Sequence, residues 1–316
     1  METMETLYED LCAAAGREKV KRDALLKRYT TFRIGGPADI LVNVSDTASL
    51  VRVMTVLLEH DAPYFMIGRG SNLVFADGGF RGTVVRSCEG TGSEGFRIVS
   101  DNEEEAVVYG FAGSTLSSLS SYACDNELTG LEFASGIPGS IGGGVLMNAG
   151  AYGGELSQCV IKSTYLDLSG DRPLEGQLEG EAQKFGYRDS AYQHNGFIVT
   201  GAFFRLGKGR AREEIASKMR ELNARRRDKQ PLEFPSAGSA FKRPPGDFAG
   251  RLIEASGLKG FRIGGAQVSE KHCGFIVNRG GATAEDVKAV INAVRERVFA
   301  DSGVMLEPEI KFAKER

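Results

Sequence analysis

Histidine and cysteine are scarce in this sequence, and tryptophan is absent. The 316 residues include three His, five Cys and no Trp. The cysteines are odd in number and form no CxxC pair, so we predict neither a disulfide framework nor a zinc site. Scattered free cysteines favour a reducing compartment, and we therefore expect a cytoplasmic protein. The three histidines are too dispersed to build a metal centre, so no metal is expected.

Long apolar runs and a surplus of charge of one sign are also missing. No run approaches the roughly 20 residues that a membrane-spanning helix needs, so membrane insertion is not expected. Residues 1–11 are acidic and lack the apolar segment of a secretory signal. The 39 basic and 42 acidic residues give a net charge of −3, which argues against a nucleic-acid partner. We expect a monomer.

Glycine, in contrast, is abundant. The chain contains 41 glycines among 316 residues, nearly twice the usual share of about 7%. Such a surplus, in a sequence without low complexity, indicates many places where the backbone turns sharply or approaches another group closely. The positions of the glycines are therefore the main guide to function.

Apolar periodicity and turn residues divide the chain into three sections, 1–88, 89–208 and 209–316. Helices and strands alternate irregularly, which favours α+β subdomains over one doubly wound sheet. Asp46 and Thr283 are expected to cap helices, because each precedes apolar residues at helical spacing. The pattern predicts helices over 7–28, after Asp46, and over 115–125, 212–227 and 284–299, and strands over 39–44, 105–111, 163–168 and 197–206.

Two glycine-rich stretches, 68–72 and 136–144, are candidate anion sites. The chain has no GxxxxGK[ST] loop, and the first stretch lacks the third glycine of the dinucleotide fingerprint. Both stretches nevertheless offer backbone N–H groups with little steric cover, as a pyrophosphate-binding nest requires. The alternative, that each is only a tight turn, stays open from the residues alone.

Six motifs in order carry a resemblance to a known family. They are GRGSNLV at 68–74, IPGSIGG with NAGAYG at 137–153, GYRDS at 186–190, PSAGSAFKRPPG at 235–246, GGAQVSEKHCGFIVN at 264–278 and LEPEI at 306–310. Together they resemble UDP-N-acetylenolpyruvoylglucosamine reductase, the MurB family, over about residues 29–312. The FKRPPG form and the compact segment 157–184 are similar to the division of that family that lacks an inserted tyrosine-bearing loop.

The resemblance implies a fold and two cofactors. The fold is an FAD-binding domain of the vanillyl-alcohol-oxidase (PCMH) type in two α+β subdomains, 1–88 and 89–208, followed by an α+β substrate domain, 209–316. The cofactors are FAD and NADPH. The residues expected to bind FAD are Gly68, Arg69, Gly70, Ser71, Asn72, Gly136, Ile137, Pro138, Gly139, Ser140, Gly142, Gly143, Asn148, Gly150 and Ala151.

The resemblance also implies a reaction, the NADPH-dependent reduction of UDP-N-acetylglucosamine enolpyruvate to UDP-N-acetylmuramate for peptidoglycan. It gives Arg188 the role of polarising the substrate carboxylate, which suits a guanidinium that stays charged and binds carboxylates bidentately. It makes Ser239 the proton donor and Glu309 a carboxylic acid that assists Arg188. On residue type alone, they would be a solvated arginine, a turn serine and one member of the strand face Glu307, Glu309 and Lys311.

Four residues are expected to contact the substrate. Lys229 and Arg243 match basic residues of the family motifs and are assigned to the diphosphate, and Tyr187 and His272 follow them. From the residues alone, the basic cluster 225–229 reads as a solvated helix end, and a lone histidine is more often a surface or satisfied core residue.

Two other functions remain to be separated from this one. The first is an oxidase of the same fold with covalently attached flavin, which acid precipitation would reveal as yellow colour in the pellet. The second is a UDP-sugar-binding or regulatory protein without turnover, whose flavin would not bleach when mixed with NADPH. The presence of all three candidate catalytic residues disfavours the second.

Overall fold

The computed structural model describes residues 2–88 and 95–313, which form two compact units. The first unit comprises Met1–Arg22, Ile40–Arg69 and Gly82–Arg225, and the second comprises Asp23–Asp39, Gly70–Arg81 and Arg226–Arg316. The predicted boundary between 88 and 89 borders residues 89–94, which lie outside the described residues. The division into three sections stays a prediction.

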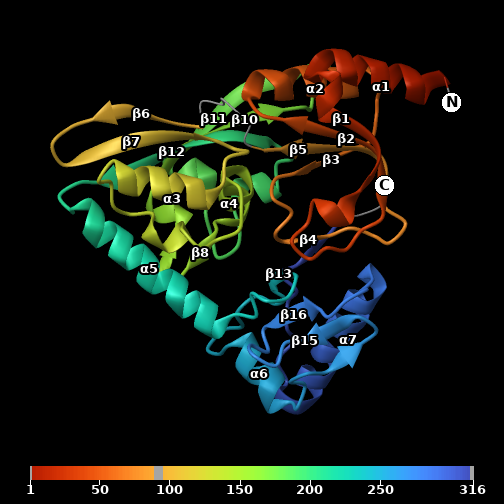
Figure 1. Ribbon diagram of the computed structural model, residues 1–316, viewed down its shortest axis with the longest axis vertical. Coiled ribbons are helices and arrows are strands. Elements are labelled where there is room, and N and C mark those ends of the chain that lie inside the picture. The colour runs from red at the N-terminus through yellow and green to blue at the C-terminus, as the bar shows by residue number, and fades with distance from the viewer. Residues whose placement is uncertain (1, 89–94, 314–316) are drawn as a thin grey trace. The chain divides into compact units, whose positions relative to one another are not determined.

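The first unit begins with two helices over a four-stranded sheet (Figure 1). In spatial order the strands are β1 (Val20–Leu25), β2 (Pro37–Val44), β5 (Phe80–Ser87) and β3 (Tyr64–Ile67). Apolar residues of α1 (Glu2–Ala15) and α2 (Thr47–Glu59) pack with those of β2 into one core. The predicted helix over 7–28 was wrong beyond Ala15, because Gly16 has φ 97° and the chain then continues as η1 (Arg17–Lys19) and β1.

A five-stranded antiparallel sheet forms the rest of this unit. Its order is β11 (Leu174–Glu179), β10 (Val160–Asp167), β12 (Ile198–Gly207), β7 (Glu105–Phe111) and β6 (Phe96–Asp101). Figure 1 shows α3 (Leu116–Asp125) and α4 (Ile141–Met147) on one side of it, where Leu116 and Val145 pack with Val108 and Phe204. The three strands predicted over this stretch are confirmed, with ends that differ by up to three residues.

The second unit is built around a smaller sheet with helices against it. The strands in order are β13 (Ser236–Ser239), β16 (Phe275–Asn278), β15 (Ala266–Val268) and β14 (Arg262–Ile263). Helices α6 (Ala249–Ala255) and α7 (Ala284–Ser302) share its apolar core, which includes Ile253, Val268, Ile276 and Ile291. The Thr283 cap is confirmed, since its hydroxyl accepts a hydrogen bond from Asp286 N at 3.0 Å.

Two earlier segments of the chain complete this second unit. Thr31 Oγ1 donates to Ser236 O at 2.7 Å, and Asn278 Nδ2 donates to Phe32 O at 3.2 Å. The short strand β4 (Leu73–Val74) pairs in parallel with β17 (Lys311–Phe312) near the end of the chain. The second unit is therefore discontinuous in sequence.

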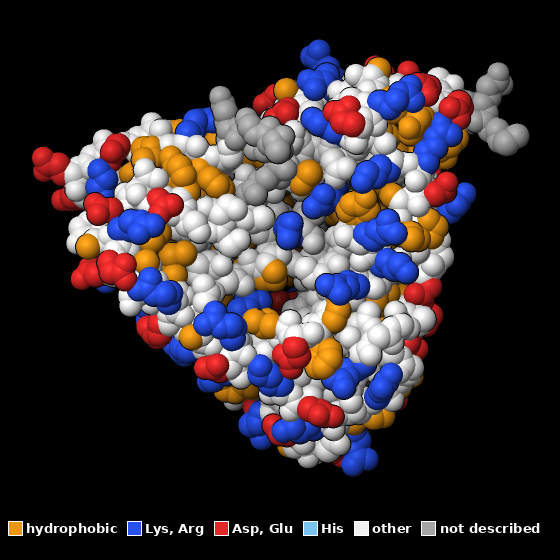
Figure 2. All heavy atoms as spheres, viewed as in Figure 1, with side chains coloured by type: hydrophobic (Ala, Val, Ile, Leu, Met, Phe, Trp, Pro, Cys, Tyr) orange, Lys and Arg blue, Asp and Glu red, His pale blue; other side chains and the backbone are white. Residues whose placement is uncertain are grey.

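The remaining elements are α5 (Arg212–Lys229) and short segments. These are η2 (Leu26–Arg28), η3 (Glu132–Ala134), β8 (Gly150–Ala151), β9 (Gly154–Glu155), η4 (Leu156–Gln158), η5 (Gly180–Gln183) and η6 (Ala191–Gln193). Among the helices of residues 2–88 and 95–313, none combines the length and the apolar character that crossing a membrane requires. Basic and acidic side chains are interspersed over the face shown in Figure 2.

Candidate functional site

The glycine stretches of the first unit approach neighbouring segments very closely. A Cβ placed on Gly68 would lie 2.0 Å from Ser140 Oγ, and one on Gly142 would lie 3.0 Å from the Cβ of Ala112. Ser140 is the N-cap of α4 and accepts a hydrogen bond from Gly143 N at 3.4 Å. Larger residues at positions 68 and 142 would displace these segments, so the glycines allow the two glycine-rich stretches to lie against their neighbours; we call the two stretches together the glycine cradle.

Two buried hydroxyls beside this cradle have no hydrogen-bond partner among the described residues. They are Ser87 Oγ and Ser114 Oγ, which flank Gly113: a Cβ on that glycine would lie 2.7 Å from Ser87 Oγ. Ser114 O accepts a hydrogen bond from Ile141 N at 2.8 Å, so it adjoins the glycine-rich stretch. An unsatisfied buried hydroxyl costs about 1–3 kcal/mol, which a bound polar group would offset. Nothing in the sequence singled these serines out.

In the second unit, Gly70 and Asn72 have structural contacts of their own. Gly70 has φ 61°, and a Cβ there would lie 2.4 Å from Tyr29 O. The side-chain Nδ2 of Asn72 donates to the backbone carbonyl of Glu309 at 3.2 Å, and the backbone carbonyl of Asn72 accepts from Lys311 N at 3.0 Å. A larger residue at position 70 would therefore disturb the protein's own backbone, and Asn72 anchors the segment that carries Glu309.

The structure brings two predicted catalytic residues onto neighbouring segments of the second unit. Ser239 ends β13, and the carbonyl of the next residue, Ala240, accepts from Glu309 N at 2.9 Å. Glu309 is partly buried, whereas Glu307 is exposed and pairs with Lys242. The two glutamates therefore differ in burial, and the assignment of the active role to Glu309 stays a prediction. The stretch expected to carry the strand face Glu307, Glu309 and Lys311 is strand only at β17, although an isolated bridge joins Pro308 to Phe241.

Arg188 belongs to the first unit. It lies in a tight turn with φ 54°, and its Nη2 donates to Gly150 O at 3.1 Å. Its guanidinium carbon lies 5.2 Å from the ring centre of Tyr187, which is exposed. Ser239 and Glu309 belong to the other unit, so the joint action of the three residues stays a prediction.

The predicted substrate residues of the second unit differ in their surroundings. Lys229 ends α5, and the guanidinium carbon of Arg243 lies 4.3 Å from the ring centre of Phe248. The imidazole of His272 accepts a hydrogen bond from Gly274 N at Nδ1, 3.1 Å away, and burial lowers its pKa. No described residue bonds its Nε2, so the neutral ring keeps one donor for a ligand.

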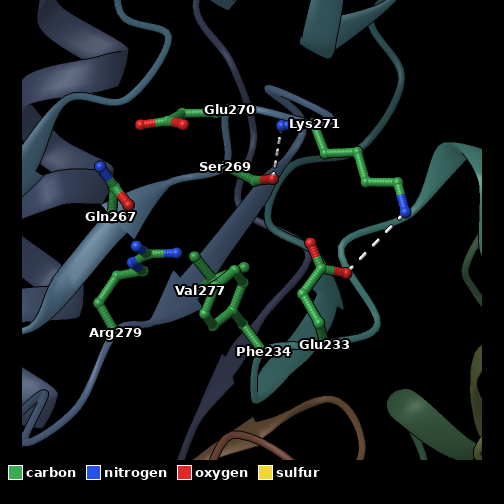
Figure 3. A pocket seen from close by; sticks show the side chains of 8 residues that line it. All are labelled: Glu233, Phe234, Gln267, Ser269, Glu270, Lys271, Val277 and Arg279. Carbon is green, nitrogen blue, oxygen red and sulfur yellow. Dashed lines mark hydrogen bonds and ion pairs between the residues drawn. The ribbon is translucent and has the colours of Figure 1, made fainter.

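A cavity of about 300 Å³ lies elsewhere in the second unit (Figure 3). Its lining residues are Glu233, Phe234, Gln267, Ser269, Glu270, Lys271, Val277 and Arg279. Lys271 Nζ donates to Arg227 O at 2.6 Å. It also pairs with Glu233 at 3.9 Å, and Figure 3 shows this pair as a dashed line. None of the predicted site residues lines this cavity, so it does not support their assignment.

Comparison with known proteins indicates which ligand the glycine cradle binds. Residues 38–172 match the model of a family described as an FAD binding domain. The matched stretch contains the close-packed glycines and the unsatisfied hydroxyls, so the residues present fit a bound FAD. The molecule is thus an FAD-binding oxidoreductase with the predicted α+β fold class.

The second unit identifies the family. Residues 230–313 match the model described as the C-terminal domain of UDP-N-acetylenolpyruvoylglucosamine reductase. The chain belongs to the UDP-N-acetylenolpyruvoylglucosamine reductase family, as its six motifs predicted. It is therefore an enzyme of the UDP-N-acetylmuramate dehydrogenase class, which uses FAD and NADPH.

Curated relatives and a solved structure agree over nearly the whole chain. The UDP-N-acetylenolpyruvoylglucosamine reductases of Lachnoclostridium phytofermentans and Clostridioides difficile are 46% and 43% identical over 313 and 309 residues, and each alignment covers 98% of both chains. The crystal structure of the Thermus caldophilus enzyme has 36% sequence identity and a TM-score of 0.75, covering 93% of this chain and 99% of that one.

Proposed function

We propose that this chain reduces the enolpyruvyl ether of UDP-N-acetylglucosamine enolpyruvate to the lactyl ether of UDP-N-acetylmuramate, using a serine as proton donor. Its reductase activity in peptidoglycan precursor synthesis follows from the family. The serine step goes further. The observation that carries it is the bond from Glu309 N to Ala240 O, which holds the backbone of Glu309 next to the strand end that carries Ser239.

The reaction requires two changes at the alkene of the substrate. FAD, held by the two glycine stretches, would supply the hydride for the methylene carbon, with NADPH as the source of that hydride. Negative charge then builds up on the substrate carboxylate as an enolate. Arg188 binds this carboxylate, because a guanidinium stays charged and stabilises the developing charge through charge-assisted hydrogen bonds.

Ser239 then gives its hydroxyl proton to the neighbouring carbon of the substrate and recovers a proton from solvent. Glu309 acts in its neutral form and donates a hydrogen bond to the enolate oxygen beside Arg188. Gly238, next to the serine, has φ 77°, and a Cβ placed on it would meet no atom of the described residues within 4 Å. The positive φ favours glycine at this position, directly before Ser239.

The remaining assignments concern binding. The FAD-binding residues are those of the two glycine stretches with Asn148, Gly150 and Ala151. Tyr187, Lys229, Arg243 and His272 hold the substrate, with the two basic residues on its diphosphate. We assign the chain to the division without the inserted tyrosine loop, because η4, β10, β11 and η5 leave only the short connection 168–173 and two single residues of the segment 157–184 outside regular elements. A cytoplasmic monomer completes the proposal.

The experiment that tests the serine step separates the two half-reactions by stopped-flow absorbance. Ser239→Ala should let NADPH bleach the flavin at nearly the wild-type rate, because that step needs no proton at the enolpyruvyl carbon. Recovery of the flavin absorbance on adding UDP-N-acetylglucosamine enolpyruvate should slow by roughly 10²–10⁴-fold. Ser239→Cys, which can still donate a proton, should restore part of the rate.

Ser236→Ala is the matched control, because it removes a hydroxyl from the same strand at a position paired with Val277. It should leave both half-reactions near their wild-type rates. Equal slowing of both half-reactions in Ser239→Ala would make Ser239 a structural turn residue. A wild-type protein whose flavin is not reoxidised by the enolpyruvyl substrate would overturn the function itself.

A further inference from the structure

The turn that carries Arg188 has an unfavourable residue at its third position. Gly186 and Asp189 exchange two backbone hydrogen bonds of 3.0 and 3.2 Å, which closes the four-residue turn. Arg188 has φ 54°, whereas Tyr187 is not among the residues with positive φ. This is the pattern of a type II turn, whose third position normally holds glycine or asparagine. Strained residues of this kind concentrate at functional sites, and they persist only where the surrounding structure fixes their conformation. The contacts that hold this turn are therefore of interest.

Two side-chain amides hold this turn from outside. Asn148 Nδ2 donates to Gly186 O at 3.0 Å, and Gln193 Nε2 donates to Arg188 O at 2.8 Å. The amide of Gln193 also donates to Leu146 O, 3.2 Å away, in the last turn of α4. Gln193 therefore joins the carbonyl of the strained arginine to a helix end, where carbonyl groups lack partners within the helix.

The backbone from which Gln193 extends is itself fixed. Its neighbour in η6, Tyr192, is 3% exposed, and its hydroxyl lies 2.7 Å from Ser163 Oγ. Ser163 in turn donates to Gln183 Oε1 at 2.7 Å. Burial raises the pKa of Tyr192 to about 12, so this hydroxyl stays neutral and keeps its bond. The side chain of Gln193 thus starts from a rigid anchor.

We propose that Gln193 is a positioning residue for Arg188. By bonding Arg188 O and Leu146 O together, it holds the turn in its left-handed conformation and fixes the direction in which the guanidinium points. The inference rests on the proposed function, in which Arg188 binds the substrate carboxylate. Gln193 does not touch the substrate; it acts through the arginine.

The test uses three substitutions in the FAD-loaded full chain. Gln193→Met keeps the length of the side chain but donates no hydrogen bond, and Gln193→Glu keeps the shape but presents acceptors to two carbonyls. Both should slow flavin reoxidation by the enolpyruvyl substrate roughly 10- to 100-fold, the usual penalty of a misplaced catalytic group. Bleaching by NADPH should remain near the wild-type rate. Gln193→Lys, whose ammonium donates to both carbonyls, should recover most of the loss.

A double-mutant cycle shows whether Gln193 acts through Arg188. In an Arg188→Ala background, Gln193→Met should slow reoxidation no further, because no guanidinium is left to position. Additive losses would overturn the proposal, as would equal slowing of both half-reactions or a Glu variant that reoxidises at the wild-type rate. If Gln193→Met does not fold, the Glu and Lys variants decide by the same criteria. Failure of the proposed function is distinguishable, because wild-type flavin would then not be reoxidised by this substrate.

Discussion

The close approach of Gly68 to Ser140 allows a prediction that links folding to flavin binding. Gly68→Ala would place a Cβ 2.0 Å from Ser140 Oγ and 3.0 Å from the Cβ of that serine. Gly68 is not among the glycines with positive φ, so its backbone accepts alanine and the effect is purely steric. The hydroxyl of Ser140 has to rotate away, and it then loses its bond to Gly143 N.

The size of the effect follows from these contacts. Losing a serine N-cap costs about 0.5–2 kcal/mol of unfolding free energy. The remaining tight contact between the two Cβ atoms belongs to the overpacking range of about 1–3 kcal/mol. With about 1 kcal/mol for the lost cap and about 1 kcal/mol, the low end of the overpacking range, for the remaining contact, we expect Gly68→Ala to lower the free energy of unfolding by about 2 kcal/mol. Ser140→Ala should lose only the cap, and the double variant should fall short of additivity by about 1 kcal/mol, because the same cap bond is lost once.

Urea unfolding of the FAD-free chain, followed by circular dichroism, measures these free energies. Titration with FAD, followed by quenching of its fluorescence, measures cofactor affinity, which should weaken about tenfold for each 1.4 kcal/mol of lost binding free energy. Gly143→Ala is the control for stability, since its Cβ would lie at an ordinary 3.4 Å from Ser140 Oγ. Strict additivity of Gly68→Ala and Ser140→Ala, or unchanged FAD affinity in Gly68→Ala, would refute the reasoning.

Two further predictions concern the second unit. Because burial lowers the pKa of His272 below 6.5, the unfolded chain binds this proton more readily, so unfolding free energy should fall as the pH drops below 6.5. His272→Gln should flatten that part of a plot of urea midpoint against pH, and an unchanged slope would contradict the assignment. Thr283→Ala should lower the free energy of unfolding by about 1 kcal/mol, because the cap of α7 is lost. Thr283→Ser should retain most of that stability in the same urea assay, because serine can also cap a helix. An equal loss of stability in both variants would argue against the cap.

Helix starts could be predicted from the sequence because their signals are local. Asp46 and Thr283 each accept the expected hydrogen bond from a backbone N–H three residues later. The helix predicted over 7–28 failed for a local reason, the positive φ of Gly16, and for a second reason outside its own sequence. Its apolar spacing continues past Gly16, but the following residues pair with β2 as a strand. A tertiary partner therefore overrides a local pattern there.

The candidate site shows the same limit. The family motifs named Arg188, Ser239 and Glu309, but only long-range backbone pairing places Glu309 beside the end of β13. Gln193 and Ser114 carry no motif signal, because an amide or hydroxyl becomes informative only when its partner is known. Their contacts depend on atoms from other elements, which no spacing rule within one segment reveals.

The discontinuity of the second unit has a consequence for its synthesis. The bonds from Thr31 to Ser236 and from Asn72 to Glu309 join residues 205 and 237 positions apart. During translation, Phe32, Ile34 and Val74 emerge long before the segments that finally bury them. Contacts of such range close slowly, and apolar side chains that wait for them are exposed to aggregation. The nascent chain thus carries part of an unfinished core until Leu306 and Ile310, which share that core, have been made.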